Sequence, residues 1–171
     1  MSPRLVLPSS EYERSYGAYI EELGDEERYP FPMDFDHADF PALLHRLDEI
    51  ARGVDIPEGY VPSSTFWLVE AGELIGVSNL RHHLNEQIRA SGGHIGLGIR
   101  PSYRGRGLGN LLMALTIGEA RKRGIDEVHI HCYKANEASA RVIISNGGVL
   151  QSEVTEGDPA VVIQRYVVDA R

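Results

Sequence analysis

Apolar residues recur with helical spacing in four segments of the chain. In the clearest segment, Leu108, Leu112, Leu115 and Ala120 fall on one side of a helix. Gly124 follows, and glycine commonly ends a helix because it adopts left-handed backbone freely. The pattern predicts helices over residues 10–23, 41–53, 108–123 and 136–146.

Shorter apolar runs, bounded by glycine, proline or polar residues, predict strands. Residues 65–70 and 74–80 flank Ala71-Gly72-Glu73, which is typical of a hairpin. Further strands are predicted over residues 4–7, 94–100, 127–133, 149–154 and 161–168, with loops over 24–39 and 56–62. The predicted order is strand, two helices, three strands, helix, strand, helix and two strands, which indicates an α+β fold.

Length and composition are those of an ordinary globular protein. At 171 residues, with 42% hydrophobic and 25% charged residues, the chain is expected to form one domain, residues 1–171, with a core that needs no disulfide. No apolar stretch is long enough to cross a bilayer, and the N-terminal apolar run is too short for a signal peptide. The single cysteine, Cys132, has no partner for an internal disulfide, so we expect a cytoplasmic protein that does not bind membranes.

The charge is negative and unevenly placed. A net charge of −8 argues against nucleic acid as a partner, because binding to phosphates needs a basic surface. Acidic residues crowd the first quarter of the chain. They form either a solvated helix face or an acidic wall that attracts a cationic ligand.

A glycine-rich basic segment lies between the predicted strand 94–100 and the predicted helix 108–123. Its sequence is Arg104-Gly105-Arg106-Gly107-Leu108-Gly109. Glycines allow a ligand to approach the backbone closely, and the first N–H groups of a helix have no partners within the helix. The helix dipole and the two arginines add positive charge, so the segment predicts an anion site suited to a pyrophosphate.

The spacing of the glycines in this segment excludes two known kinds of nucleotide-binding site, the P-loop and the Rossmann turn. The chain has no Gly-x-x-x-x-Gly-Lys-Ser/Thr string, and counted from Gly105 the third glycine of a Rossmann turn would fall on Asn110. The spacing Arg104-x-x-Gly107-x-Gly109 instead resembles the Arg/Gln-x-x-Gly-x-Gly/Ala signature of the GNAT superfamily of N-acetyltransferases. A glycine turn that only starts a helix is the alternative.

Two further segments resemble the same family, so the resemblance covers most of the chain. Residues 97–105 are similar to the family's passage from strand to turn. Residues 136–148 are similar to its helix after the fifth strand, in the branch that includes ribosomal-protein alanine acetyltransferases. The resemblance implies a mixed, mostly antiparallel sheet of six to seven strands, flanked by about four helices and splayed between strands 4 and 5. It also implies an acceptor-side half, residues 1–90, and an acetyl-CoA-binding half, residues 91–171.

The resemblance implies acetyl-CoA as the donor and assigns residues to its binding. Leu97 and Ile99 would hold pantetheine and the acetyl group through the backbone, and Gly96 and Gly98 would ease a bulge and the approach of the ligand, or only relieve packing. The pyrophosphate would bind at Arg104, Gly105, Arg106, Gly107, Leu108, Gly109 and Asn110. Asn136 and Ser139 would line the other side of the cleft.

The resemblance also implies two catalytic positions. The backbone N–H of Ile99 would stabilise negative charge on the acetyl oxygen. An amine with a pKa of about 10.4 is deprotonated in only about one molecule in a thousand at neutral pH, so a base is useful. His94 occupies the place of the family's glutamate, on the strand face opposite Ile95, Leu97 and Ile99. It is either that base or a histidine bonded to its neighbours.

One position departs from the family. Many members carry a tyrosine that protonates the departing thiolate, where this chain has Ile143. Tyr133 is close in sequence, and the thiolate could also leave unassisted. The departure keeps a second function open, a module that binds or senses acyl-CoA without turnover.

The remaining expectations concern metal and partners. His129 and His131 share one strand face, but no cluster of Cys or carboxylates accompanies them, so no metal is expected. The acceptor is expected to be an amine, either a small cationic molecule or a protein N-terminus. Homodimers are common in the family, and the sequence leaves the oligomeric state open.

Overall fold

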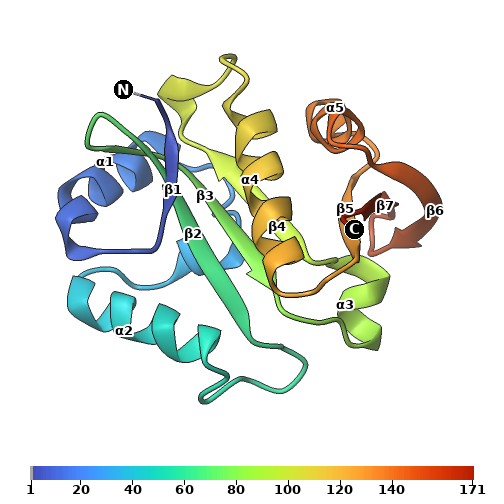
Figure 1. Ribbon diagram of the computed structural model, residues 1–171, viewed down its shortest axis with the longest axis horizontal. Coiled ribbons are helices and arrows are strands. Elements are labelled where there is room, and N and C mark those ends of the chain that lie inside the picture. Colours follow the sequence, from blue (N-terminus) through green and yellow to red (C-terminus); the bar gives the residue numbers. More distant parts are fainter. Residues whose placement is uncertain (1) are drawn as a thin grey trace.

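Seven strands arranged in two antiparallel groups form the centre of this computed structural model, which describes residues 2–171 (Figure 1). One group has the order β1-β2-β3-β4 and the other β5-β7-β6. The strands are β1 (Arg4–Val6), β2 (Ser63–Glu70), β3 (Glu73–Arg81), β4 (Ile95–Ile99), β5 (Glu127–Tyr133), β6 (Val149–Glu156) and β7 (Val161–Asp169). The helices are α1 (Glu13–Leu23), α2 (Phe40–Ala51), α3 (Glu86–Ser91), α4 (Leu108–Lys122) and α5 (Glu137–Ser145), with short 3-10 turns at Ser10–Tyr12, Phe31–Asp34 and Pro101–Tyr103.

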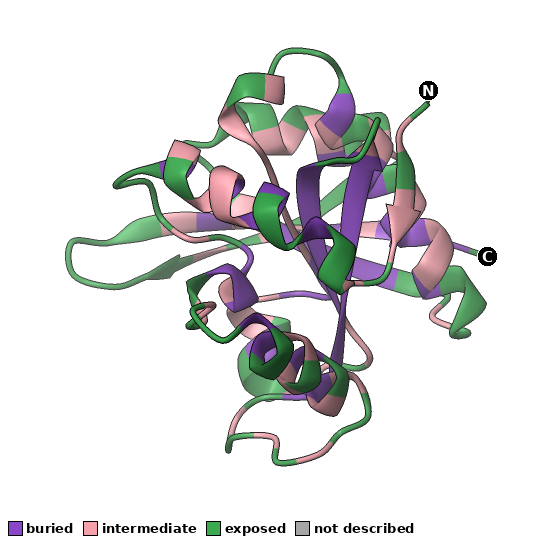
Figure 2. Ribbon diagram, turned by 90° about the vertical axis from the view of Figure 1, so that its left-hand side faces the viewer, coloured by how far each residue is buried: buried purple, intermediate pink, exposed green. Residues whose placement is uncertain are grey.

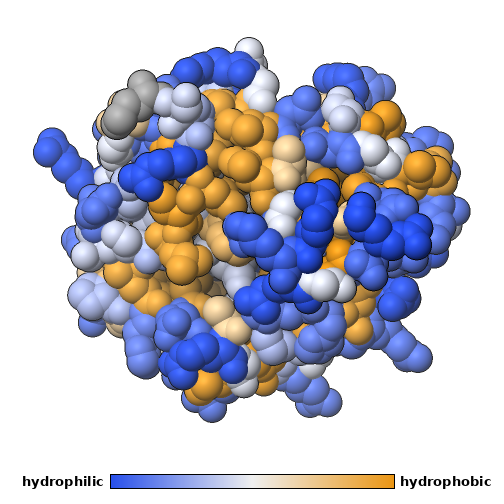
Figure 3. Space-filling model, viewed as in Figure 1, coloured by the Kyte–Doolittle hydropathy of each residue, from blue (hydrophilic) through white to orange (hydrophobic). Residues whose placement is uncertain are grey.

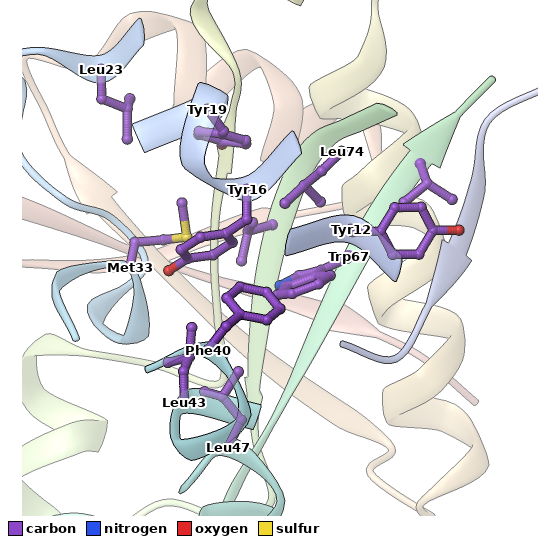
Figure 4. Close-up of a cluster of buried hydrophobic side chains, with 12 residues drawn as sticks. Tyr12, Tyr16, Tyr19, Leu23, Met33, Phe40, Leu43, Leu47, Trp67 and Leu74 are labelled. Atoms are coloured by element: carbon purple, nitrogen blue, oxygen red, sulfur yellow. The ribbon is translucent and has the colours of Figure 1, made fainter. Parts of the chain in front are cut away.

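Helices cover both faces of the first group of strands. On one face α1 and α2 pack an aromatic cluster against β2, in which Tyr16, Phe40 and Trp67 lie together (Figure 4). On the other face α4 packs Leu112 against Leu68 and Ile75. Because both faces are covered, nearly every residue of β2 and β3 is buried, and buried and exposed positions do not alternate along them (Figure 2).

The two groups of strands touch at one end and separate at the other. An isolated bridge joins Gly93, just before β4, to Ile130 of β5. Beyond that bridge β4 and β5 do not pair, and the second group carries its β6–β7 hairpin away from the body of the molecule (Figure 2). A wedge-shaped cleft therefore opens between β4 and β5.

The structure follows the predicted order of elements with four differences. The predicted helix 10–23 begins with a 3-10 turn that Ser9 caps, and the predicted loop 24–39 contains the 3-10 turn Phe31–Asp34. The sequence pattern missed α3, which spans only six residues and is too short for a helical period to be visible. The expected bulge in β4 is absent, because β3 and β4 pair from Gly76↔Ile99 to Leu80↔Ile95 without a shift in register. Shifts in register occur instead between β2 and β3, at Leu68/Val69, and between β6 and β7, at Leu150/Ser152.

Within residues 2–171, no helix is both long enough and apolar enough to cross a bilayer.

Candidate functional site

The backbone of β4 directs unused polar groups into the cleft. In the antiparallel pairing with β3, the N–H of Arg100 donates to Ile75 and the carbonyl of His94 accepts from Arg81, at 2.9 and 2.7 Å. Residues alternate in the neighbour that their N–H and C=O groups face, so Leu97 and Ile99 face away from β3 and toward β5. A ligand in the cleft can bond to these two residues as an added strand would.

The opposite wall of the cleft is built in the same way. Lys134 donates to Val162 of β7 at 2.9 Å, so the same alternation along β5 turns the backbone groups of His129 and His131 toward β4. The backbone N–H and C=O of His129 both form hydrogen bonds with His94 at the closed end of the cleft. His131 lies two residues farther along β5, toward the open end.

His94 lies at the closed end of the cleft and outside its cavities. Its backbone N–H donates to the His129 carbonyl at 2.6 Å, and its Nδ1 accepts the His129 backbone N–H at 2.9 Å. Burial, aided by His129 and Arg89, lowers the pKa of His94 to about 4. With Nδ1 engaged, the neutral ring carries its proton on Nε2 and has no free lone pair. This geometry favours a structural role for His94, and its assignment as a base stays a prediction.

The open end of the cleft carries the glycine turn. Gly105 and Gly107 have φ of +80° and +76°, and a Cβ added at either would meet no atom within 4 Å. Gly107 is the N-cap of α4 and offers no side chain to the helix, so the N–H groups of Leu108, Gly109 and Asn110 keep no side-chain cap. The turn thus has the open space and the unpaired donors that an anion requires.

Both arginines of the turn are paired in the structure. Arg104 donates through Nε to the Ile99 carbonyl at 2.9 Å and forms an ion pair with Glu26 at 3.0 Å. Arg106 pairs with Glu70 at 3.2 Å and lies over the Tyr103 ring. Arg104 therefore fixes the turn to the end of β4. An incoming phosphate would compete with exposed carboxylates for both guanidinium groups.

Two cavities meet in the cleft. One, of about 750 Å³, runs between β4, α4 and α5 and includes the glycine turn; Figure 3 shows the surface hollowed at the edge between α4 and α5. The other, of about 620 Å³, opens toward α1, the loop after it and the β6–β7 hairpin. Residues that line both cavities mark the junction: Glu26, Tyr29, Leu97, Gly98, Ile99, Arg104, His131, Asn136 and Ser139. Because each volume suits a small ligand, the arrangement accommodates two ligands end to end.

Tyr29 covers the face of β4 that Gly96 and Gly98 leave bare. A Cβ on Gly96 would lie 2.7 Å from the Tyr29 hydroxyl, and one on Gly98 would lie 2.7 Å from the Tyr29 carbonyl. The two glycines therefore make room for Tyr29. About half of Tyr29 is exposed, but its hydroxyl end is enclosed, and that burial raises its pKa against the opposing charge of Arg81.

His131 is buried at the same junction without hydrogen bonds to its ring. Only 8% of the residue is exposed, and neither ring nitrogen has a hydrogen-bond partner. Burial lowers its pKa to about 4, with His129 and Arg165 acting in the same direction. The Ser91 backbone opposes that shift without reaching hydrogen-bonding geometry. The ring is thus neutral at neutral pH.

The helix after β5 supplies the outer wall of the cleft. Asn136 caps α5, because its Oδ1 accepts the Ser139 backbone N–H at 3.1 Å, and both residues line both cavities. Ile143 is 1% exposed and reaches the cavity beside α4. No hydroxyl is therefore supplied from this position.

The second cavity has an acidic rim. Glu26, Glu27 and Glu156 line it, and Glu26 is the one among them that pairs with Arg104. The acidic wall considered from sequence thus lies partly at this cavity, with Glu156 added from the distant β6. Within residues 2–171, no group of three or more His, Cys, Asp or Glu side chains is arranged to hold a metal ion.

The structure brings most of the predicted residues together and adds others. Leu97, Ile99, Asn136, Ser139 and the turn 104–110 surround one cleft, except for Arg106, which lines neither cavity and pairs with Glu70. His94 lies behind the cleft. Sequence reasoning missed Tyr29, which lies in a predicted loop. It noticed that His129 and His131 share a strand face but weighed them only as metal ligands. Alternation along 127–133 was the available signal for His131.

Comparison with known proteins agrees with this geometry. The Acetyltransferase (GNAT) family matches residues 18–144. Mycothiol acetyltransferase from Thermobispora bispora is 33% identical over 105 residues, which are 59% of this chain and 35% of that protein. The chain thus spans about a third of the length of this curated relative.

Solved structures share the fold at low sequence identity. Ribosomal-protein-S5-alanine acetyltransferase from Vibrio fischeri has a TM-score of 0.73 and 15% identity, over 99% of this chain and 94% of that one. A putative acetyltransferase from Salmonella typhimurium, with its cofactor acetyl-CoA, has a TM-score of 0.67 and 14% identity, over 100% and 95% of the two chains. The predicted fold is confirmed, with seven strands, a split between β4 and β5, and five helices where about four were expected. The chain belongs to the Acetyltransferase (GNAT) family.

Proposed function

We propose that this chain transfers the acetyl group of acetyl-CoA to a primary amine, by direct attack within a ternary complex. One observation carries the proposal: the backbone N–H groups of Leu97 and Ile99 face away from β3 and lead along the cleft to the uncapped N-terminus of α4. A ligand with an amide-bearing arm at one end and a pyrophosphate at the other matches the order of these backbone groups along the cleft.

Different residues of the cleft would bind different parts of acetyl-CoA. The turn from Arg104 to Asn110 would hold the pyrophosphate through backbone N–H groups, and Leu97 would bond to the pantetheine arm. The bound donor supplies a thioester whose carbonyl carbon accepts the amine. The N–H of Ile99, fixed by the bond between its own carbonyl and Arg104, would stabilise the negative charge that develops on the acetyl oxygen.

The acceptor would enter through the cavity with the acidic rim. Glu27 and Glu156 favour an amine that arrives as a cation, and the net charge of −8 attracts such a molecule from a distance. A small cationic molecule such as a polyamine fits this charge. A protein N-terminus is the other class, supported by the likeness to an enzyme whose name gives ribosomal protein S5 alanine as its substrate.

Two measurements test the proposal. Calorimetric titration with acetyl-CoA is expected to give one binding event per chain, and the absence of heat at millimolar concentration would overturn the donor site. Thiol release is then followed with spermidine, lysine, kanamycin and an alanine-terminated peptide. Faster release with any of these amines than with buffer alone identifies an acetyltransferase reaction.

The sequence left open a module that binds acyl-CoA without turnover, because Ile143 replaces a tyrosine. Family membership and the separate second cavity favour turnover, since a sensor needs only the donor site. Acetyl-CoA binding without thiol release for any amine would favour the sensor instead.

A further inference from the structure

A proton donor near the departing sulfur would make the thiolate a better leaving group, and the Ile143 side chain has no proton to give. Among the tyrosines that line the cleft, Tyr19 and Tyr133 reach only the second cavity, and Tyr103 reaches only the one beside α4. Tyr29 alone among them lines both. The junction of the cavities is where the acetyl carbon and the amine must meet.

We propose that Tyr29 is the proton donor to the departing thiolate, supplied by the loop between α1 and α2 in place of a residue on α5. The proposal rests on the proposed acetyl transfer. It assigns a catalytic role to a residue of the predicted loop 24–39.

The position of the hydroxyl is the first argument. A Cβ on Gly96 would lie 2.7 Å from the Tyr29 hydroxyl oxygen and 3.0 Å from the adjacent ring carbon, so the hydroxyl rests directly on β4. Gly98 receives the Tyr29 backbone in the same way. The side chain is thereby held beside Leu97, whose backbone faces the cleft from the next position.

The protonation state is the second argument. Burial raises the pKa of Tyr29, and Glu27 acts in the same direction, while Arg81 opposes them. The phenol thus stays protonated at every pH at which the enzyme would work. An ordinary thiol has a pKa of about 8.5 and is a stronger acid than this phenol, so Tyr29 first stabilises the developing thiolate by donating a hydrogen bond. The proton passes to sulfur as the attacking nitrogen returns one to Tyr29.

An amine that arrives as a cation first releases one proton to solvent and becomes neutral. From the neutral amine onward the proton balance closes: the C–N bond forms and the C–S bond breaks, the nitrogen loses one proton and the sulfur gains one. The attacking nitrogen becomes acidic once it is bonded to the acetyl carbon. Tyr29 can therefore give its proton to sulfur and recover one from nitrogen, ending unchanged.

Tyr29→Phe is the first test. It removes the hydroxyl and keeps the ring on Gly96, so we expect the Kd for acetyl-CoA to stay within about twofold and kcat to fall about 100-fold, the scale of a lost acid catalyst. Tyr60→Phe is the matched control: Tyr60 is 53% exposed against 49% for Tyr29 and lies outside both cavities of the cleft. An unchanged kcat in Tyr29→Phe would overturn the proposal.

Leaving-group dependence separates proton donation from positioning. An aryl thiolate is a weaker base than an alkyl thiolate and needs less help from a donor. With two truncated donors, S-acetyl-N-acetylcysteamine and S-acetylthiophenol, we expect Tyr29→Phe to slow the alkyl thioester much more than the aryl one. Equal losses with both donors would show that Tyr29 only positions the reactants and would overturn the assignment.

A second variant approaches the same hydroxyl from the strand. Gly96→Ala places a methyl group against it and should lower kcat while acetyl-CoA still binds. Gly118→Ala, where an added Cβ meets nothing within 4 Å, is the control. Failure of the proposed function is distinct, since the unaltered protein would then release no thiol with any amine.

Discussion

Single glycines decide what the turn before α4 can bind. Gly107 combines a φ of +76° with open space around the position of a Cβ, so nothing in the protein fills the place that a phosphate would take. A side chain there would occupy the site and add backbone strain at once.

Gly107→Glu is expected to weaken acetyl-CoA binding at least about 100-fold, because a carboxylate would fill the anion site at the start of α4 and repel the phosphates. Calorimetry measures the change. Gly124→Glu is the matched control, since Gly124 has a φ of +79° and open surroundings at the far end of the same helix. Equal weakening by both variants would show that backbone strain, and not the site, caused the loss.

His94→Asn separates the two roles that the sequence left open for His94. An asparagine Oδ1 can accept the His129 N–H as Nδ1 does, but an amide cannot act as a base. From the geometry we expect kcat within about threefold of the unaltered protein, whereas loss of a base typically costs at least about 100-fold. A loss of that size with acetyl-CoA affinity retained would restore the assignment of His94 as base.

At the scale of elements, Arg100 joins α1 to the edge where β3 and β4 end. It forms ion pairs with Glu22 of α1 and Glu73 of β3, and its Nη1 also donates to the Leu74 carbonyl. The side chain is only 12% exposed. Burial would raise the pKa of Glu22, but the hydrogen bonds from Arg100 and Ser102 hold it below the usual range. The Ser15 hydroxyl, followed by Arg100, lowers the pKa of Glu73.

Arg100→Met should lower the free energy of unfolding by about 2 kcal/mol, because it leaves the partly buried Glu22 and the half-exposed Glu73 without their cation and removes the hydrogen bond to the Leu74 carbonyl. Urea denaturation measures the loss. Arg52→Met is the comparison: Arg52 pairs with Asp48 on the exposed side of α2, and its removal should cost less than about 0.5 kcal/mol. Similar losses in the two variants would contradict a special role for Arg100.

The sequence predicted those elements whose signal is local. The spacing of Leu108, Leu112 and Leu115 was enough for α4, and glycines marked the turn before it. The position of Tyr29 over Gly96 was not predictable, because Tyr29 belongs to a loop 67 residues before Gly96 and no local sequence pattern relates the two. For the same reason the sequence left two explanations open for Gly96 and Gly98, a bulge with close ligand approach or relief of packing, and the contacts with Tyr29 agree with the second.

At the scale of the whole molecule, buried histidines gather where the two groups of strands meet. His94 and His131 are 5% and 8% exposed, and His94 is bonded to His129 across the only bridge described between β4 and β5 in residues 2–171. Burial lowers the pKa of both to about 4, and that of His82, at the end of β3, to a similar value. The joint that keeps the cleft wedge-shaped therefore depends on neutral rings.

Acid should accordingly destabilise the fold before the carboxylates titrate. Above a pH of about 6.5 these histidines are neutral in both states; between about 6.5 and 4 the unfolded chain binds protons that the folded chain does not, so the free energy of unfolding falls as pH falls. For His94 alone the loss from pH 7.5 to 5 is of order 2 kcal/mol. Denaturation at these two pH values should show a smaller fall in His94→Asn than in the unaltered protein. His45→Asn, which changes an exposed histidine, should leave the fall as it is. If His94→Asn lost as much stability as the unaltered protein, the bond from His129 would not depend on a neutral ring, and the joint between β4 and β5 would owe its acid sensitivity to other groups.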